Sequence, residues 1–330
     1  MLAAPVTVIA VSAVRTGCGK SPIARWLGRR LRRRGLRAAV LRHPMPYGEL
    51  AREGVQRFAT RADLDAAQCT IEEREEYEPH LADGNVVFAG VDYPAIVRRA
   101  AAEADVIVWD GGNNDFPFVR PDLHLVVVDA LRPDDATRYH PGETVLRMAD
   151  VVVVNKVDAA GAGDEARAIA AVRSVRPDVP LVRAASPVRL DDAGRVRGRR
   201  VLVVEDGPTI THGGMPWGAG WVAATAAGAA AIVDPRPAAA PALAEVYARH
   251  PHIGPVLPAI GYTPDQLDAL RSTIERAGAD VVVAATPMDL AARLGLAIPV
   301  VRARYEFDDA GEPTLAGVID EFLDRLPAAG

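Results

Sequence analysis

The chain has 330 residues, a formal net charge of −5, and apolar and charged fractions of 49% and 25%, which indicate a folded globular protein rather than a disordered one. The mildly acidic balance gives no reason to expect nucleic acid as a partner, and no run of about 18 uncharged apolar residues is present to span a membrane. Two cysteines, Cys18 and Cys69, are too few for a disulfide framework or a four-ligand zinc site. We therefore expect a cytoplasmic protein with one main domain and an appended lobe.

Apolar β-branched runs alternate with alanine- and arginine-rich helical stretches along the chain. Several runs are continuously apolar, which is typical of strands buried on both faces of a parallel sheet. The main expected strands are residues 6–13, 37–41, 86–89, 106–110, 123–129, 151–155, 181–184, 201–205, 231–234, 281–285 and 300–303. Helices are expected between them, for example at 21–34, 94–103 and 164–175. We predict an α/β fold with a mostly parallel wound sheet and helices on both faces.

The turn after the first strand has the sequence Val14-Arg-Thr-Gly-Cys-Gly-Lys-Ser21. A buried strand, this glycine turn and a helix together indicate a Walker A phosphate loop, although its first position is valine instead of glycine. The glycines let the backbone N–H groups converge on phosphates, and the following helix adds its positive end. Lys20 is expected to contact the β and γ phosphates, Ser21 to bind Mg²⁺, and the rest of the loop to bind the nucleotide through Thr16, Gly17, Cys18 and Gly19. A signal peptide is not expected, because its removal would remove this loop.

Two residues of the loop leave their roles open. Arg15 lies where the dimeric ATPases of the MinD and dethiobiotin synthetase class carry a signature lysine. It is expected to reach a phosphate in its own or a partner subunit, with a solvent-facing arginine as the alternative. Cys18 lies near a helix N-terminus, where thiol pKa values fall, but a small loop residue is the preferred interpretation over a nucleophile.

Two later strands end in further candidate nucleotide residues. The strand at 106–110 ends in Asp110, the expected Walker B carboxylate for Mg²⁺, with a helix-capping role as the alternative. Asn113 and Asn114 follow and are expected to bind substrate at the carboxyl end of the strand. The strand at 151–155 runs into Asn155-Lys156-Val157-Asp158, a motif that selects guanine in GTPases. A base site formed by Asn155, Lys156 and Asp158 is expected, and ATP and GTP both remain open as co-substrates.

The charged, glycine-containing stretch 188–200 is the expected domain boundary. We predict a P-loop NTPase core over residues 1–187 and a C-terminal α/β lobe packed on it over residues 188–330. One continuous domain is the alternative.

Long sequence strings resemble the cyclic 2,3-diphosphoglycerate synthetase family, among them Trp-Asp-Gly-Gly-Asn-Asn-Asp-Phe-Pro-Phe at 109–118 and Arg-Tyr-His-Pro-Gly-Glu-Thr at 138–144. Others lie at 13–21, 41–48, 69–78 and 205–215, so that the resemblance covers nearly the whole chain. It implies ATP-dependent closure of an intramolecular phosphoanhydride in 2,3-diphosphoglycerate, with release of ADP and phosphate, and a dimer. Family members, often labelled GTPases, carry an additional N-terminal domain, whereas this chain begins a few residues before the P-loop strand.

Three polar clusters follow predicted strands and favour an anionic small-molecule substrate. They contain Arg42 and His43, then Arg138 and His140, then Thr211 and His212. A capped turn is the alternative for each cluster taken alone. The acidic run at 72–78 is either a solvated helix face or, together with Tyr77, Pro79 and His80, a group that binds Mg²⁺ or orients an acceptor.

The expected reaction is phosphoryl transfer to a substrate oxygen followed by displacement of the phosphate. The residues expected to carry it are Lys20, Arg15, Asp110, Arg42 and His43. A regulatory GTPase or metallochaperone-type switch that uses residues 155–158 for guanine is the alternative. A ligase like dethiobiotin synthetase would share the loop and differ in its acceptor.

Overall fold

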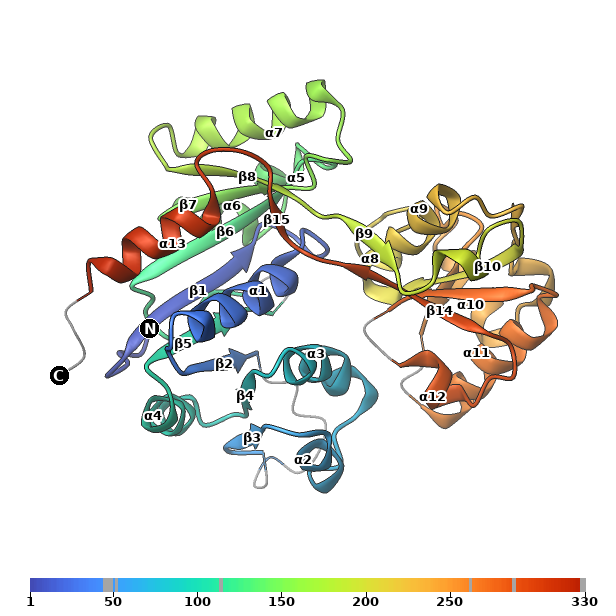
Figure 1. Cartoon of the computed structure of the whole chain (residues 1–330), viewed down its shortest axis with the longest axis horizontal. Coiled ribbons are helices and arrows are strands. Elements are labelled where there is room, and N and C mark those ends of the chain that lie inside the picture. Colours follow the sequence, from blue (N-terminus) through green and yellow to red (C-terminus); the bar gives the residue numbers. More distant parts are fainter. Residues whose placement is uncertain (44–49, 51–52, 113–114, 261–262, 287–288, 327–330) are drawn as a thin grey trace. The chain divides into compact units, whose positions relative to one another are not determined.

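The computed structural model describes residues 1–43, 50, 53–112, 115–260, 263–286 and 289–326, and the chain forms two compact units (Figure 1). Unit 1 comprises residues 1–67, 79–187 and 306–330, and unit 2 comprises residues 68–78 and 188–305. The predicted lobe 188–330 differs from unit 2 at its end. The chain returns to unit 1 because β15 (Asp308–Asp309) pairs antiparallel with β8 (Leu181–Ala185) of the unit 1 sheet.

Unit 1 is built on one sheet, whose described strands follow the order β15-β8-β7-β6-β1-β5-β2-β4-β3. Its other strands are β1 (Thr7–Ala13), β2 (Ala38–Arg42), β3 (Gln56–Phe58), β4 (Val86–Ala89), β5 (Val106–Asp110), β6 (Leu123–Asp129) and β7 (Val151–Asn155). Neighbouring strands are parallel except at the two edges, where β3 and β15 run antiparallel to their partners. The predicted wound, mostly parallel sheet is confirmed.

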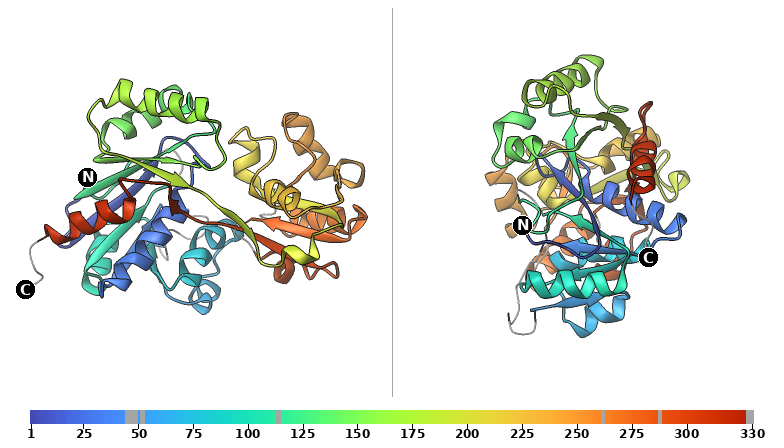
Figure 2. Two further views of the ribbon diagram at one scale, coloured as in Figure 1. Left: turned by 45° about the horizontal axis from the view of Figure 1, so that its top comes forward. Right: turned by 90° about the vertical axis from the view of Figure 1, so that its left-hand side faces the viewer.

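Helices accompany these strands. They are α1 (Lys20–Arg33), α2 (Arg61–Ala66), α3 (Ile71–Ala82), α4 (Tyr93–Glu103), α5 (Asp135–Arg138), α6 (Gly142–Arg147), α7 (Ala162–Val175) and α13 (Leu315–Asp324). One of them, α3, begins among residues 68–78 of unit 2. In α1, Ile23, Leu27 and Leu31 recur every four residues and are buried, as expected for an amphipathic helix. Helices α1 and α13 lie side by side in Figure 1 and in both views of Figure 2, and Arg34, which directly follows α1, pairs with Asp320 of α13 over 3.0 Å.

Unit 2 has its own sheet, with described strands in the order β11-β10-β13-β14-β9 and β12 paired to β10. The strands are β9 (Val188–Leu190), β10 (Arg200–Asp206), β11 (Ala231–Ile232), β12 (Leu257–Ala259), β13 (Val281–Ala285) and β14 (Val300–Tyr305). The helices are α8 (Gly207–Thr211), α9 (Ala219–Ala226), α10 (Pro241–Arg249), α11 (Pro264–Arg276) and α12 (Leu290–Leu294). Short 3₁₀ turns lie at Ala193–Arg195 and Arg236–Ala238.

Alternate residues of β10 face two separate cores, which explains why this strand is apolar without interruption. Val201 and Val203 pack into the core that contains Ala224 of α9. Leu202 and Val204 pack into the core on the other face, with residues of α11 and α12. Both faces of the unit 2 sheet are therefore covered by helices. Among the described residues, none of the helices combines the length and the apolar composition that a membrane crossing requires.

Candidate active site

The predicted phosphate loop joins β1 to α1 in unit 1. Gly17 and Gly19 have φ angles of 81° and 97°, a left-handed conformation that residues with a Cβ atom rarely adopt. Gly19 precedes α1, and among the described residues no side chain caps this end of the helix. The N–H groups of the first helical turn are therefore available to an anion. Lys20 and Ser21 lie in this turn.

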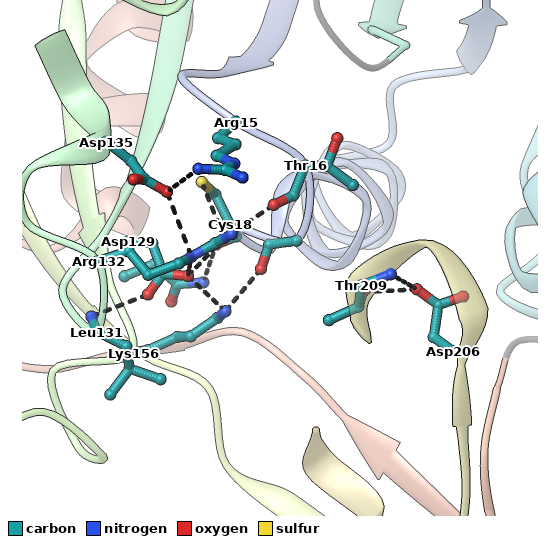
Figure 3. A network of polar contacts seen from close by, with 12 residues as sticks. Arg15, Thr16, Cys18, Asp129, Leu131, Arg132, Asp135, Lys156, Asp206 and Thr209 are labelled. Atoms are coloured by element: carbon teal, nitrogen blue, oxygen red, sulfur yellow. Dashed lines mark hydrogen bonds and ion pairs between the residues drawn. The ribbon is translucent and has the colours of Figure 1, made fainter. Parts of the chain in front are cut away.

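The loop is held in shape by side chains at the end of β7 and after β6 and β7 (Figure 3). Three consecutive carbonyl oxygens each accept a hydrogen bond from one such side chain. The pairs are Arg132 with Thr16 at 2.8 Å, Lys156 with Gly17 at 2.6 Å and Asn155 with Cys18 at 2.9 Å. Because the carbonyl and N–H of a trans peptide point in opposite directions, the N–H groups of residues 17–19 point away from these donors. The loop therefore presents a ready-made nest for phosphate oxygens.

Asp129, at the end of β6, organises two of these donors. Its Oδ2 lies 2.8 Å from Lys156 Nζ and 2.9 Å from Arg132 Nη2. Burial alone would raise the pKa of Asp129, but the charges of Lys156 and Arg132 outweigh burial and lower it. Sequence reasoning did not single out Asp129 as a site residue. The sequence did carry a signal that could have identified Asp129, because a second apolar strand beside the P-loop strand ends in this aspartate.

Cys18 is buried within the loop, and Arg132 approaches its sulfur at 3.8 Å. Burial raises the pKa of the thiol to about 11, against the smaller opposing effect of Arg132. A thiol this weakly acidic is not a thiolate at neutral pH, so the interpretation of Cys18 as a small loop residue is the one that this geometry favours.

Asp110, at the end of β5, is fully buried and meets several donors. Arg42 Nη1 lies 2.7 Å from its Oδ2, and Lys20 Nζ lies 3.5 Å from its Oδ1. Burial by itself would raise the pKa of Asp110, but Arg42, then Lys20, and a hydrogen bond from His80 hold it far below its usual range. Asp110 is therefore an anion at neutral pH.

His80, near the end of α3, is a buried partner of Asp110. Its Nε2 lies 2.9 Å from Asp110 Oδ2, and its Nδ1 lies 3.2 Å from Asn85 Nδ2. Burial lowers the pKa of His80 despite the hydrogen bond to Asp110. The ring is therefore neutral, with its proton on Nε2 facing the carboxylate, because Nδ1 faces an amide donor. The sequence grouped His80 with the acidic run as an alternative site for Mg²⁺ or an acceptor group, but it gave no signal of the contact with Asp110.

Ser21 and Asp110 supply hard oxygen donors suited to Mg²⁺. Ser21 Oγ lies 3.5 Å from Asp110 Oδ1, beside the nest that would hold the phosphates. Mg²⁺ usually takes one or two protein side chains and completes its shell with water and phosphate oxygens. The two residues fit such an ion, and Mg²⁺ binding remains a prediction.

Arg15 contacts two side chains of its own subunit. Its Nη1 lies 3.1 Å from Asp135 Oδ2, and its guanidinium stacks 3.7 Å from the centre of the Tyr139 ring. Its side chain is 18% exposed, so the solvent-facing alternative does not describe this position.

Arg42 and His43 lie at the carboxyl edge of the sheet, but in different environments. Arg42 is buried, and besides Asp110 it donates to the carbonyl of Gly111 at 3.3 Å. His43 is half-exposed, and its Nδ1 lies 2.7 Å from Asp115 Oδ2. Asn113 and Asn114 lie outside the described residues.

The remaining predicted substrate residues belong to both units. The Arg138 side chain is 68% exposed and lies 3.6 Å from Asp134, and the ring of His140 lies 6.4 Å from that of Phe116. Thr211 belongs to unit 2, where its hydroxyl donates to the Gly207 carbonyl at 2.7 Å. His212 follows, with Nδ1 3.1 Å from that hydroxyl. Their roles stay predictions.

The residues of the predicted base motif make two different kinds of contact. Asn155 and Lys156 bind the phosphate loop, as described above. Asp158 accepts a hydrogen bond from the backbone N–H of Ser186 at 2.9 Å, which fixes the carboxylate at the end of β8. Contacts of Asp158 with a nucleobase stay a prediction.

Comparisons with known proteins place this site in context. No family model matches the sequence. Arginine synthetase ArcE of Thermococcus kodakarensis is 51% identical over 322 residues, which cover 98% of this chain and 72% of the relative. A tetraacyldisaccharide 4'-kinase of Halorhodospira halophila is 36% identical over 173 residues, or 49% of each chain.

Among solved structures, LpxK from Aquifex aeolicus in complex with ATP has a TM-score of 0.55 at 15% identity, over 98% of this chain and 90% of that one. At this identity the likeness shows the fold alone. None of these three proteins is named for cyclic 2,3-diphosphoglycerate, so that finer assignment stays a prediction. Two are named as a synthetase and a kinase, which indicates a nucleotide-dependent enzyme. With 51% identity over almost its whole length, the chain belongs to the family of arginine synthetase ArcE.

Proposed function

We propose that this protein is an ATP-dependent synthetase that forms arginine by activating a ureido oxygen and displacing it with ammonia. The observation that carries the proposal is the preset phosphate loop beside Lys20, Ser21 and Asp110, in a chain 51% identical to an arginine synthetase. A P-loop of this kind supports phosphoryl transfer from a nucleoside triphosphate.

The chemistry of the product indicates how that phosphoryl group is used. The end carbon of the arginine side chain carries three nitrogen atoms. A precursor with oxygen in place of one nitrogen is the ureido amino acid citrulline. Its C–O bond is difficult to break because the ureido oxygen is a poor leaving group. Transfer of the γ-phosphoryl group to that oxygen releases ADP and creates a leaving group. Ammonia then forms the new C–N bond, and phosphate leaves.

The residues of unit 1 divide this work between positioning and charge neutralisation. Lys20 is proposed to contact the β and γ phosphates, and the loop N–H groups hold the remaining oxygens. Mg²⁺ bound by Ser21 and Asp110 would neutralise phosphate charge. Arg42 keeps Asp110 ionised and oriented, which makes it a positioning residue. Arg15 is proposed to act in its own subunit, since Asp135 and Tyr139 hold it beside its own loop.

Cyclisation of 2,3-diphosphoglycerate is the second candidate. It is favoured by the long strings at 109–118, 138–144 and 205–215 that resemble that family. The two reactions share activation by phosphoryl transfer and differ in the group that displaces the phosphate. A guanine-nucleotide switch is the alternative without a metabolite, favoured by the motif at residues 155–158.

One assay separates these candidates. Release of ADP and GDP would be measured with Mg²⁺ and each triphosphate, with citrulline and ammonia, with 2,3-diphosphoglycerate, or with no addition. The expected result is ADP release that requires citrulline and ammonia and equals the arginine found by mass spectrometry. Cyclic product seen by phosphorus NMR would establish the second candidate. Slow GTP hydrolysis that ignores all these compounds would refute both and favour the switch.

A further inference from the structure

His43 and Asp115 form a pair that phosphate binding does not use. His43 Nδ1 lies 2.7 Å from Asp115 Oδ2, and the N–H of Gly112 donates to the same oxygen at 3.0 Å. The side chains of His43 and Asp115 are 43% and 17% exposed. In the part of the chain that the structure describes, no other group bonds to the His43 ring. The carboxylate is thus fixed from two sides, and among the described residues no group bonds to Nε2 of the histidine.

The packing around Gly112 holds the ring in this orientation. A Cβ atom at residue 112 would lie 2.8 Å from Cγ of His43 and 3.1 Å from Oδ2 of Asp115. The histidine ring therefore packs directly on the backbone of Gly112, which leaves no room for a larger residue there. The pair is built into the loop and is more than a contact between two mobile surface side chains.

The sheet places this pair on the acceptor side of the phosphate site. Strands β2 and β5 are parallel neighbours, and Arg42 lies opposite Asp110 in their register. His43 directly follows Arg42, and Gly112 comes two residues after Asp110. Substrates of wound α/β proteins bind outside the carboxyl ends of such strands. The His43 ring therefore lies at the edge where a substrate beyond the γ-phosphate would be held.

An imidazole that donates Nδ1–H to a carboxylate has a lone pair on Nε2 and a fixed direction. We propose that His43, oriented by Asp115, is the general base for the nitrogen nucleophile, an inference that rests on the proposed function. Ammonium, the main form of ammonia at neutral pH, passes one proton to Nε2 of His43. The freed lone pair forms the C–N bond, the C–O bond breaks, and phosphate leaves with the electron pair of the C–O bond and takes the surplus proton of the new nitrogen as hydrogen phosphate. The imidazolium then returns its proton to water.

This assignment also bears on the choice of substrate. Closure of a phosphoanhydride in 2,3-diphosphoglycerate uses a phosphate oxygen that carries no proton to remove at neutral pH. An ammonium ion, in contrast, cannot attack carbon until a base has taken its proton. The His43–Asp115 pair therefore has a task in arginine formation that it would not have in the cyclisation.

The test compares two nucleophiles in the full-length protein with ATP, Mg²⁺ and citrulline. Hydroxylamine is a much weaker base than ammonia and is already a free amine at neutral pH, so it needs no general base. We expect His43→Gln to lower kcat with ammonia by about 10²–10⁴-fold, the usual contribution of a general base. The same variant should lose less than about tenfold with hydroxylamine, since only the base is missing. The KM for ATP should not change.

Asp115→Asn is the second variant, and His250→Gln in unit 2 is the matched histidine control. Asp115→Asn keeps the shape of the side chain and should show the same preference for hydroxylamine. Its loss of kcat with ammonia should be smaller than that of His43→Gln, because the variant keeps the imidazole of His43 and loses only the carboxylate that orients it. It also carries the test if His43→Gln does not fold. His250→Gln should match the unaltered protein with both nucleophiles.

The outcomes separate the two proposals. An equal loss with ammonia and hydroxylamine, or no loss with either, would overturn the general-base role of His43. An unaltered protein whose ADP release ignores both nucleophiles would overturn the proposed function itself, whatever the variants do.

Discussion

The two carboxylates that flank strand β1 share one setting and differ in what they control. Asp110 ends β5 and Asp129 ends β6, and these strands pair with β1 on its two sides. Both side chains are fully buried, and in both the neighbouring cations outweigh burial and lower the pKa. The two cations bound to Asp129, Arg132 and Lys156, also donate hydrogen bonds to backbone carbonyls of the phosphate loop. The side chains around Asp110 include Lys20 and Ser21, which are placed to meet the nucleotide.

The difference shows that an apolar strand ending in aspartate does not by itself specify a role. The role depends on the position of the lysine that is bound to each aspartate and on what else this lysine contacts. Lys156 bridges Asp129 to the Gly17 carbonyl, so this aspartate shapes the loop. Lys20 lies in the first turn of α1, so Asp110 acts where phosphate and Mg²⁺ are predicted to bind.

The largest effect is expected from Lys20→Ala. Loss of this cation should lower turnover by at least about 10²–10³-fold, as for other groups that stabilise charge in a transition state. Folding should be little affected, because Arg42 and His80 still partner Asp110. Steady-state ADP release and urea unfolding would be measured together. Normal turnover in this variant would remove Lys20 from the site.

Asp129→Asn tests the other side of the comparison. Removing this charge leaves Arg132 and Lys156, whose side chains are 11% and 18% exposed, without their shared counter-ion. The free energy of unfolding should fall by about 3–5 kcal/mol, as when one partner of a buried ion pair is removed. Nucleotide affinity should weaken as well, because two loop carbonyls lose their anchored donors. Urea unfolding and nucleotide titration give both quantities. A variant with unchanged stability and affinity would show that Asp129 does not organise the loop.

The lowered pKa of Asp129 should also affect how the stability of the protein depends on pH. The folded-state pKa of Asp129 is lowered, so its contribution is present above the unfolded-state pKa, about 3.9 for aspartate. It is lost as the pH falls below that value, because the unfolded chain binds the proton first. The unfolding free energy of the unaltered protein should therefore decrease from about pH 5 downward, and less steeply in Asp129→Asn. Equal slopes in the two proteins would contradict the lowered pKa.

The fold was largely predictable from the sequence because most of its strands are continuously apolar and end in polar residues. The predicted strands at 86–89, 106–110, 123–129 and 151–155 match β4, β5, β6 and β7 residue for residue. The return of residues 306–330 to unit 1 was not predictable, because a two-residue strand such as β15 has no recognisable pattern.

The site was predictable only where a local motif carries the chemistry. Residues 14–21 and Asp110 follow known spacings, and their neighbours in the sheet follow from the strand order. His80 and Asp129 depend on partners far away in the sequence, His80 on Asp110 and Asp129 on Lys156. The contact of Asp115 with His43 likewise depends on the pairing of β2 with β5. Such contacts leave no periodic signal in one sequence.

The smallest effect is expected at Cys18, whose backbone lies in the nest while its side chain is buried. Cys18→Ala keeps the backbone N–H and the left-handed glycines on either side, so turnover should stay within about threefold and stability should fall by about 1 kcal/mol. Because the thiol pKa is raised to about 11, iodoacetamide at pH 7.5 should alkylate Cys18 on the order of 10²-fold more slowly than an exposed cysteine. The rate would be followed by mass spectrometry in a Cys69→Ala background, with the urea-unfolded protein as the reference. Rapid alkylation that ATP prevents would instead identify a thiolate in the phosphate loop, and the neutral, space-filling role of Cys18 would be wrong.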